Sequence, residues 1–225
     1  MISESAQAGI TKTGTGALEL SGANTFTGAT AVQGGILSID SLANVNAGPS
    51  ALGNPADATA GTIKLGLTTA VTTLRYTGGG STTNRVIDLA GTTVGPTIDA
   101  SGTGALVFTS NFTASGAGAK TLTLTGSNTD ANTIGGAIVN STGATSVIKS
   151  GLGTWVLGGN NTYTGTTTIN SGLLRTGADN VLPDTTAVTI NATTADGTAT
   201  LDLANHNDTV LSLTFGGATA GANST

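Results

Sequence analysis

The chain has 225 residues, of which only 8% are charged, against about a quarter in an ordinary globular domain. It has no cysteine, which excludes disulfides, iron–sulfur clusters and thiolate zinc sites, and no apolar run reaches the roughly 18 residues that span a membrane. Seven Lys and Arg residues with a net charge of −5 cannot form the basic surface that nucleic acid requires. Very few Lys and Glu residues, with many Thr residues, weigh against long helices. A chain without cysteine, with low charge and abundant Thr, Asn and Gly (35 residues), is typical of a surface or secreted bacterial protein.

Alternation of apolar and polar residues begins with a 28-residue unit that runs from Ile10 to Leu37. Leu18 and Leu20 share one phase and Glu19 takes the other, which is the period of a half-buried strand. Gly and Asn residues then interrupt the strands, because Gly accepts positive φ and Asn bonds its own backbone. The unit therefore predicts about three short strands separated by corners.

The longest irregular stretch is 41–57, where Pro49 and Pro55 exclude a central strand. Strand signals resume after it, and no later stretch has helical periodicity. Short strands are expected at Gly61–Leu65, Val71–Tyr76, Arg85–Leu89, Thr97–Asp99, Ala105–Phe108, Thr121–Thr125, Ala137–Val139, Ala187–Ile190, Ala199–Leu203 and Val210–Phe215.

The 28-residue unit occurs a second time, without a gap, from Val147 to Leu174. Equivalent residues lie 137 positions apart and include Lys12 and Lys149, Leu18 and Trp155, Asn24 and Asn161, and Phe26 and Tyr163. Recurrence of one unit at a fixed spacing indicates a repeat architecture, in which each unit buries its apolar face against its neighbours.

Short strands and tight corners fit either a β-sandwich or a parallel β-helix. A sandwich predicts longer strands joined by two-residue hairpin turns, and such turns are few here. We therefore predict that residues 1–225 form a single β-solenoid, with repeat units near 10–40 and 147–177. At roughly 23 residues a turn, the chain would make about ten turns, the two copies would lie about six turns apart, and the rod would be on the order of 45–50 Å long.

The segment Gly14–Gly28 (GTGALELSGANTFTG) and its copy Gly151–Gly165 (GLGTWVLGGNNTYTG) resemble the passenger-associated β-strand repeat of autotransporter proteins. The resemblance implies a right-handed parallel β-helix displayed outside a Gram-negative-type cell, either extracellular or on the outer-membrane surface. In that family the passenger is part of a longer chain with an export signal and a C-terminal outer-membrane domain. We expect the same of these residues. The repeat carries no catalytic residues that could be transferred.

The acidic residues are spread singly along the chain. Asp196, Asp202 and Asp208 are six positions apart, which does not match a turn of about 23 residues, so their carboxylates need not converge. Asp88 and Asp99 are expected to end strands and to face water. Because acid–base catalysis needs converging groups, we predict no catalytic residues and no enzyme activity.

The sequence does not favour a metal site or a phosphate site. Asp184, Asp196 or Asp202, with backbone carbonyls, is a candidate for calcium, but neither the GGxGxD repeat nor an EF-hand loop is present. Gly78–Ser81 lacks the Lys of a phosphate loop and is interpreted as a corner. His206, the one histidine, is assigned to a loop. We therefore predict no metal site and no cofactor.

Aromatic residues could stack on sugars, but a structural role is favoured for each of them. Trp155 takes an inward position in its unit, so packing in the core is predicted. Phe26 and Tyr163 are expected to cap the stack at a corner. Asn24 and Asn161 are expected to satisfy corner backbone groups that the strands leave unpaired.

Threonine-rich segments at Thr121–Thr125 and Thr166–Thr168 raise the alternative of ice binding. That function needs a flat array of outward Thr residues over many turns, and the sequence shows the pattern in few.

The main functional hypothesis is a structural stalk or fibre scaffold of a surface or secreted protein, which self-associates through its open ends. The alternative is an adhesin that binds a surface glycan or another ligand of a host or neighbouring cell, with the loop 41–57 as the binding face. A polysaccharide-active enzyme is the third hypothesis.

Overall fold

The structure is a computed structural model that describes residues 1–2, 7–67, 70–92, 95–191 and 198–216. Within these residues it contains nineteen short strands and one helical turn. The strands are β1 (Ile10–Lys12), β2 (Ala17–Leu20), β3 (Thr30–Val32), β4 (Gly35–Ile39), β5 (Ile63–Leu65), β6 (Thr72–Tyr76), β7 (Gly79–Thr83), β8 (Ile87–Leu89), β9 (Thr97–Ala100), β10 (Gly104–Phe108), β11 (Lys120–Thr125), β12 (Asn132–Ile134), β13 (Thr145–Lys149), β14 (Thr154–Leu157), β15 (Thr167–Ile169), β16 (Gly172–Thr176), β17 (Ala187–Asn191), β18 (Ala199–Asp202) and β19 (Ser212–Gly216). The helix α1 is Ala58–Gly61.

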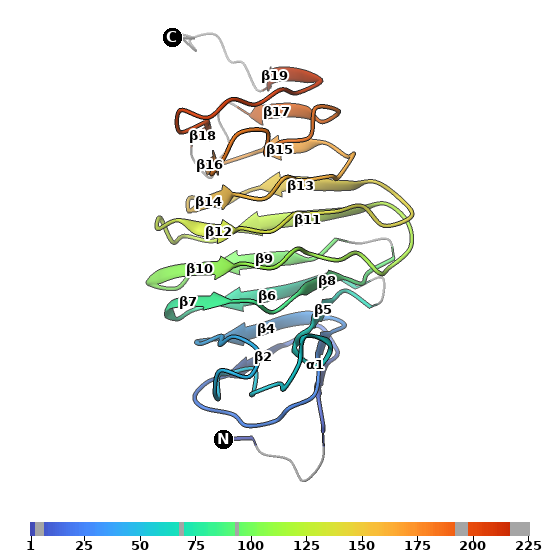
Figure 1. Cartoon of the computed structure of the whole chain (residues 1–225), viewed down its shortest axis with the longest axis vertical. Helices are drawn as coiled ribbons and strands as arrows, with labels where there is room; N and C mark the ends of the chain where they lie inside the picture. Colours follow the sequence, from blue (N-terminus) through green and yellow to red (C-terminus); the bar gives the residue numbers. More distant parts are fainter. Residues whose placement is uncertain (3–6, 68–69, 93–94, 192–197, 217–225) are drawn as a thin grey trace.

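The described strands form three sheets in which every pair of neighbouring strands is parallel. The long sheet has nine strands in the order β2-β4-β6-β9-β11-β13-β15-β17-β19. The medium sheet is β7-β10-β12-β14-β16-β18, and the short sheet is β1-β3-β5-β8. Strands of the long and medium sheets stack one above another along the longest axis of the molecule (Figure 1). Because consecutive strands lie in different sheets while each sheet is parallel, the chain is a parallel β-helix, as the sequence predicts.

The turns of the coil differ in length. In the long sheet Ile36 pairs with Ala17, 19 positions earlier, whereas Thr72 pairs with Gly35, 37 positions earlier. Later turns take between 20 and 26 residues. The long sheet has nine described strands, one for each turn, which is close to the ten turns expected. At about 4.8 Å between strands, they span about 38 Å.

The two repeat copies occupy different faces of the coil. In the first copy β2 belongs to the long sheet, but its sequence equivalent β14 belongs to the medium sheet. Likewise β3 lies in the short sheet and its equivalent β15 in the long sheet. Within the long sheet, five successive strand pairings, each one turn of the coil, lead from Ala17 in β2 to Ile148 in β13. The chain then passes to the medium sheet, where it forms β14. The separation of the copies is thus five turns plus one face, somewhat less than the about six turns expected, because the 37-residue turn takes up more of the chain than the others.

One continuous core runs inside the coil. Alternate residues of each strand point inward and are buried, as in β11, where Leu122 and Leu124 are fully buried between half-buried Thr residues. Aliphatic side chains fill most layers, and Tyr76 and Phe108 fill others. The thin-layered, aromatic-poor core that the composition indicates is therefore present.

The stretch 41–57 closes the side of the first turns, which have no medium-sheet strand among the described residues. It is irregular, as expected, and ends in α1, whose Ala60 N–H donates to the capping Asp57 carboxylate (2.8 Å). The sequence did not predict this helical turn. Two strands also differ from expectation: Gly79–Thr83 is a strand and not a corner, and Ala137–Val139 is irregular while Asn132–Ile134 forms β12.

Candidate functional site

A buried lysine of the second repeat links two turns at a glycine corner. The Lys149 Nζ donates to the carbonyl oxygens of Ser150 (2.9 Å), Gly151 (2.7 Å) and Ser171 (2.9 Å). Its side chain has no solvent exposure, and burial lowers its pKa to about 8, so the amine stays protonated at neutral pH. Three N–H donors therefore meet three acceptors, one of which lies in the next turn.

The first repeat builds the same ammonium cage. Lys12 is buried and donates to three carbonyl oxygens at the equivalent positions, including that of Gly34 in the next turn (2.9 Å). Lys120 has a related arrangement outside the repeats, since its Nζ donates to Gly91 (2.7 Å) and Gly116 (2.6 Å). Sequence reasoning treated the lysines only as too few for a basic surface. The signal that could have found them is a Lys placed just before a Gly corner in both copies.

Buried asparagines also tie successive turns together. Asn161 accepts from the Ile138 N–H (2.7 Å) of the preceding turn and donates to the Val181 carbonyl (2.9 Å) of the following one. Asn24 makes the same two bonds at 2.6 and 2.9 Å, and Asn132 repeats the arrangement in the medium sheet. The role predicted for Asn24 and Asn161 is confirmed.

The loop 41–57 is mostly a wall of the core. Leu42 and Leu52 are buried, and the buried Arg85 donates to the Leu52 carbonyl (2.7 Å). Burial lowers the pKa of Arg85 to about 10. Asn46 and Ala47 are exposed at the tip. Asn44, Pro49, Ala56 and Asp57 are also exposed, so the surface that this loop offers to a ligand is confined to such positions and is not the whole stretch.

The aromatic residues of the repeats are buried. The Trp155 indole has no exposure and donates to the Thr125 carbonyl (2.9 Å), which confirms the predicted core position. The Tyr163 hydroxyl bonds to that of Thr167 (2.7 Å), and burial raises the pKa of Tyr163 to about 12. Phe26 is likewise buried. These rings are closed to a sugar ligand in this structure.

Two aspartates that were expected to face water are buried instead. Asp88 accepts from the hydroxyl (3.1 Å) of Thr113 and from the N–H (2.9 Å) of Ser115, in the next turn. Asp99 accepts from the Arg75 Nε (2.7 Å) on the neighbouring strand. Each carboxylate is satisfied by a partner one turn away, which a strand-by-strand reading of the sequence does not show.

The other acidic candidates are used separately. Asp202 pairs with Arg175 (2.8 Å), and Asp208 accepts from the N–H groups of Val181 and Leu182. Asp196 lies outside the described residues. No group of three or more His, Cys, Asp or Glu side chains that could hold a metal ion occurs in the part of the chain that the structure describes.

The remaining sequence candidates have local roles. Asp184 is exposed on a turn, and burial, together with the charge of Asp184, raises the pKa of Asp208. The His206 Nδ1 lies 3.3 Å from the Asp179 carboxylate in a loop, as expected. In Gly78–Ser81, Ser81 and the Gly80 N–H contact the Tyr76 hydroxyl (3.1 and 2.8 Å), so this segment packs on the core.

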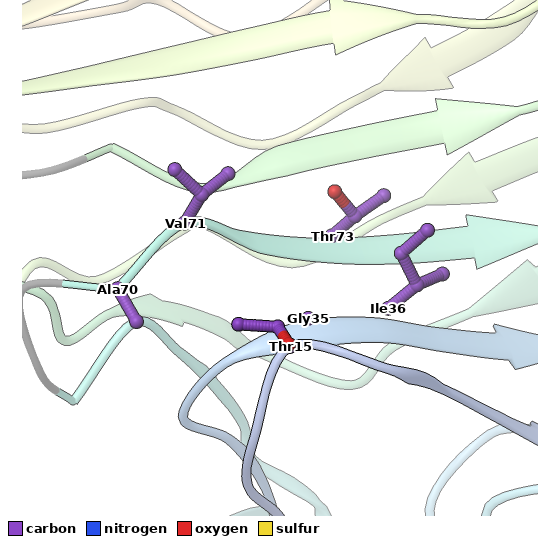
Figure 2. A pocket seen from close by; sticks show the side chains of 6 residues that line it. All are labelled: Thr15, Gly35, Ile36, Ala70, Val71 and Thr73. Atoms are coloured by element: carbon purple, nitrogen blue, oxygen red, sulfur yellow. The ribbon is translucent and has the colours of Figure 1, made fainter.

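A shallow groove of about 440 Å³ opens on the outer face of the long sheet. Its lining residues are Thr15, Gly35, Ile36, Ala70, Val71 and Thr73. Figure 2 shows Val71 just before β6 and Thr73 within it, with Gly35 and Ile36 on the adjacent β4. The lining is uncharged and largely apolar, which suits a neutral ligand or a weak contact and offers no acid–base chemistry.

Comparison with known proteins identifies the repeat. Residues 10–39 and 147–175 match the family described as the passenger-associated-transport-repeat. The chain carries two autotransporter passenger repeats. The resemblance seen in the sequence is thereby confirmed, and the buried Lys, Asn and aromatic residues described above are the structural content of each passenger repeat.

A relative supports the same assignment. The chain is 43% identical, over 155 residues, to the adhesin BmaC autotransporter of Brucella suis biovar 1 (strain 1330). The match covers 67% of this chain and 4% of that protein, so the chain spans a small part of its relative's length. No solved structure matches the chain. No helix among the described residues is long and apolar enough to cross a membrane.

Proposed function

We propose that the chain is a rigid scaffold of a surface-exposed autotransporter passenger, located outside the cell or on its outer membrane. The observation that carries this proposal is the unbroken long sheet, whose turns are tied together by Lys149, Asn161 and their equivalents. Such a coil is held by contacts between neighbouring turns and forms a stiff rod. Small-angle X-ray scattering tests this point: an elongated particle is expected, and a compact or flexible one would contradict the proposal.

Self-association is the partner interaction that the scaffold proposal includes. Among the described residues, no strand pairs with the outer edge of β19, and its inward-facing Leu213 and Phe215 are 50% and 67% exposed. An open edge with apolar side chains can pair with another coil. Light scattering should show association that increases with concentration and decreases in Phe215→Lys. A monomer at every concentration would remove this part of the proposal.

An adhesive role is the second proposed function, and the observation that favours it is the relative named as an adhesin. Beads coated with the chain should bind to host or neighbouring bacterial cells, and beads coated with an unrelated β-helix should not. Deleting residues 41–57 would remove core residues such as Leu52, so the tip substitution Ala47→Arg is the better test of that loop. The separate use of the described carboxylates supports a non-enzymatic role, which assays on neutral and acidic polysaccharides would check.

A further inference from the structure

A column of outward side chains runs along the whole long sheet, and we call it the threonine column. In register from the first strand to the last, it consists of Ala17, Ile36, Thr73, Thr97, Thr123, Ile148, Thr168, Thr189 and Thr214. Six of its nine members are Thr, drawn from six different turns. Parallel pairing places successive members about 4.8 Å apart. The sequence shows only the two local Thr-rich segments, because neighbours in this column are 19 to 37 positions apart in the chain.

The hydroxyls of this column are not used by the fold. Those of Thr123, Thr168 and Thr189 make no hydrogen bond to another described residue, and these side chains are half-buried on the outer face. A second column lies two positions earlier on the strands, where Thr121 faces Ser146 and Ala187 faces Ser212. Each hydroxyl can both donate and accept. The threonine column therefore presents a regular series of unpaired donors and acceptors beside methyl groups, whereas in the second column the Ser146 hydroxyl already accepts from the Thr166 N–H (3.1 Å).

The face is uncharged where the columns are most regular. From β11 to β19 none of the outward residues is ionisable. Below β11 the charges of Arg75 and Asp99 are paired with each other (2.7 Å). At its lower end the threonine column enters the 440 Å³ groove, because Ile36 and Thr73 belong to both (Figure 2). The column and the groove thus form one continuous track along the axis of the coil, which has no ionisable outward side chain from β11 to β19 and has the exposed Glu19 beside it on β2.

We infer that this track binds an extended, neutral polysaccharide lying along the coil axis. The strand spacing of about 4.8 Å is close to the length of one sugar unit in an extended β-linked chain, so one sugar hydroxyl can meet each turn. The Thr methyl groups would contact the apolar faces of the sugars, and the absence of outward ionisable side chains from β11 to β19 matches a neutral polymer. This inference rests on the proposed adhesive function and names the ligand class for it.

Two other occupants fit the track less well. A strip about 38 Å long and about 16 Å wide offers roughly 600 Å², less than the about 800 Å² per partner of a stable dimer. An ice surface requires the same side chains at every turn, whereas Ile148 and Ala187 interrupt the two columns. A flexible polymer bound by many weak contacts tolerates such interruptions.

Affinity electrophoresis of the 225-residue chain tests the inference, with hydroxyethylcellulose and mixed-linkage β-glucan as neutral probes and polygalacturonate as the acidic one. The neutral probes should retard the chain. The isosteric pair Thr168→Val and Thr189→Val removes two hydroxyls and should weaken binding about tenfold, since each hydrogen bond contributes modestly. The pair Thr168→Lys and Thr189→Lys should abolish it. Thr200→Lys, exposed on the medium sheet, controls for the added charge and should bind normally.

Four results would overturn the inference: no retardation by either neutral probe, retardation by polygalacturonate alone, equal binding by all variants, or adsorption to ice that the Lys pair abolishes. Circular dichroism should show that the Val and Lys pairs keep their β structure, because both positions face outward. If coated beads adhere to cells while neither neutral probe binds, the inference fails and the adhesive function stands. If the neutral probes bind but no cell is bound, the adhesive function fails.

Discussion

Lys12 and Lys149, which lie 137 positions apart in the chain, each donate to an equivalent set of three backbone carbonyl oxygens. The cages lie in different sheets, because β13 carries Lys149 in the long sheet and β1 carries Lys12 in the short sheet. The repeat therefore forms the same corner at two different positions around the coil. What the two copies share is the set of contacts between one turn and the next, and not a fixed position around the axis.

Removing the ammonium group should expose the energetic role of the cage. Lys149→Met keeps most of the apolar stem but leaves one buried and two half-buried carbonyls without their donor, so we expect the free energy of unfolding to fall by about 3 kcal/mol. Urea denaturation measures the change. Lys64→Met, at an exposed position of β5, is the matched control and should change stability little. Equal effects of the two substitutions would show that the cage contributes nothing specific.

The asparagine bridge makes a similar prediction for a neutral group. Asn161→Ala removes hydrogen bonds to the turns before and after it and should lower stability by about 1–3 kcal/mol without abolishing binding. Asn160→Ala, at the exposed neighbouring position, should leave the melting temperature nearly unchanged. Calorimetry on both variants decides the matter, and an unchanged melting temperature for Asn161→Ala would count against the bridge.

Substitutions at two glycines of the first repeat distinguish the cost of backbone strain from the cost of a steric clash. Gly14 and Gly35 both have positive φ, at 70° and 68°. A Cβ at Gly14 would meet nothing within 4 Å, whereas one at Gly35 would overlap the Gly16 carbonyl oxygen. Gly14→Ala should therefore cost about 1–2 kcal/mol, and Gly35→Ala should cost distinctly more. Similar unfolding midpoints for the two variants would disprove the tight corner at Gly35.

Ionisation of the buried Tyr163 hydroxyl should lower the stability of the fold at high pH. Its folded-state pKa of about 12 lies above the ordinary value of 10.0, so its contribution is complete below pH 10 and is lost as the pH rises through 12. The loss amounts to at most about 2.7 kcal/mol. Tyr163→Phe cannot ionise and should show a shallower decline in urea midpoint between pH 10 and pH 12. Parallel declines in the two proteins would exclude this cause.

Local patterns in the sequence predict much of this fold. Alternation in Thr121–Thr125 predicts an outward Thr row over buried Leu residues, and the inward phase of Trp155 predicts its burial. The matched positions of Asn24 and Asn161 predict their bridging role. Each of these inferences depends on a period of two or on a corner residue, which are properties of a few neighbouring residues.

Contacts between turns could not be predicted in the same way. The one-face rotation of the second copy depends on the lengths of all intervening turns, including the 37-residue turn that contains 41–57. Asp88 and Asp99 are buried because their partners arrive from adjacent turns. The threonine column is hidden for the same reason, since its members meet only once the pairing register is known.

The most direct test of this account is a distance between two positions of the threonine column. Nitroxide labels at Thr73 and Thr189, introduced into the cysteine-free chain, would be separated by five strand spacings, or about 24 Å. Double electron–electron resonance should give a single narrow distribution near that value. A broad distribution, or one centred far from it, would contradict the in-register coil on which the scaffold and the polysaccharide track both depend.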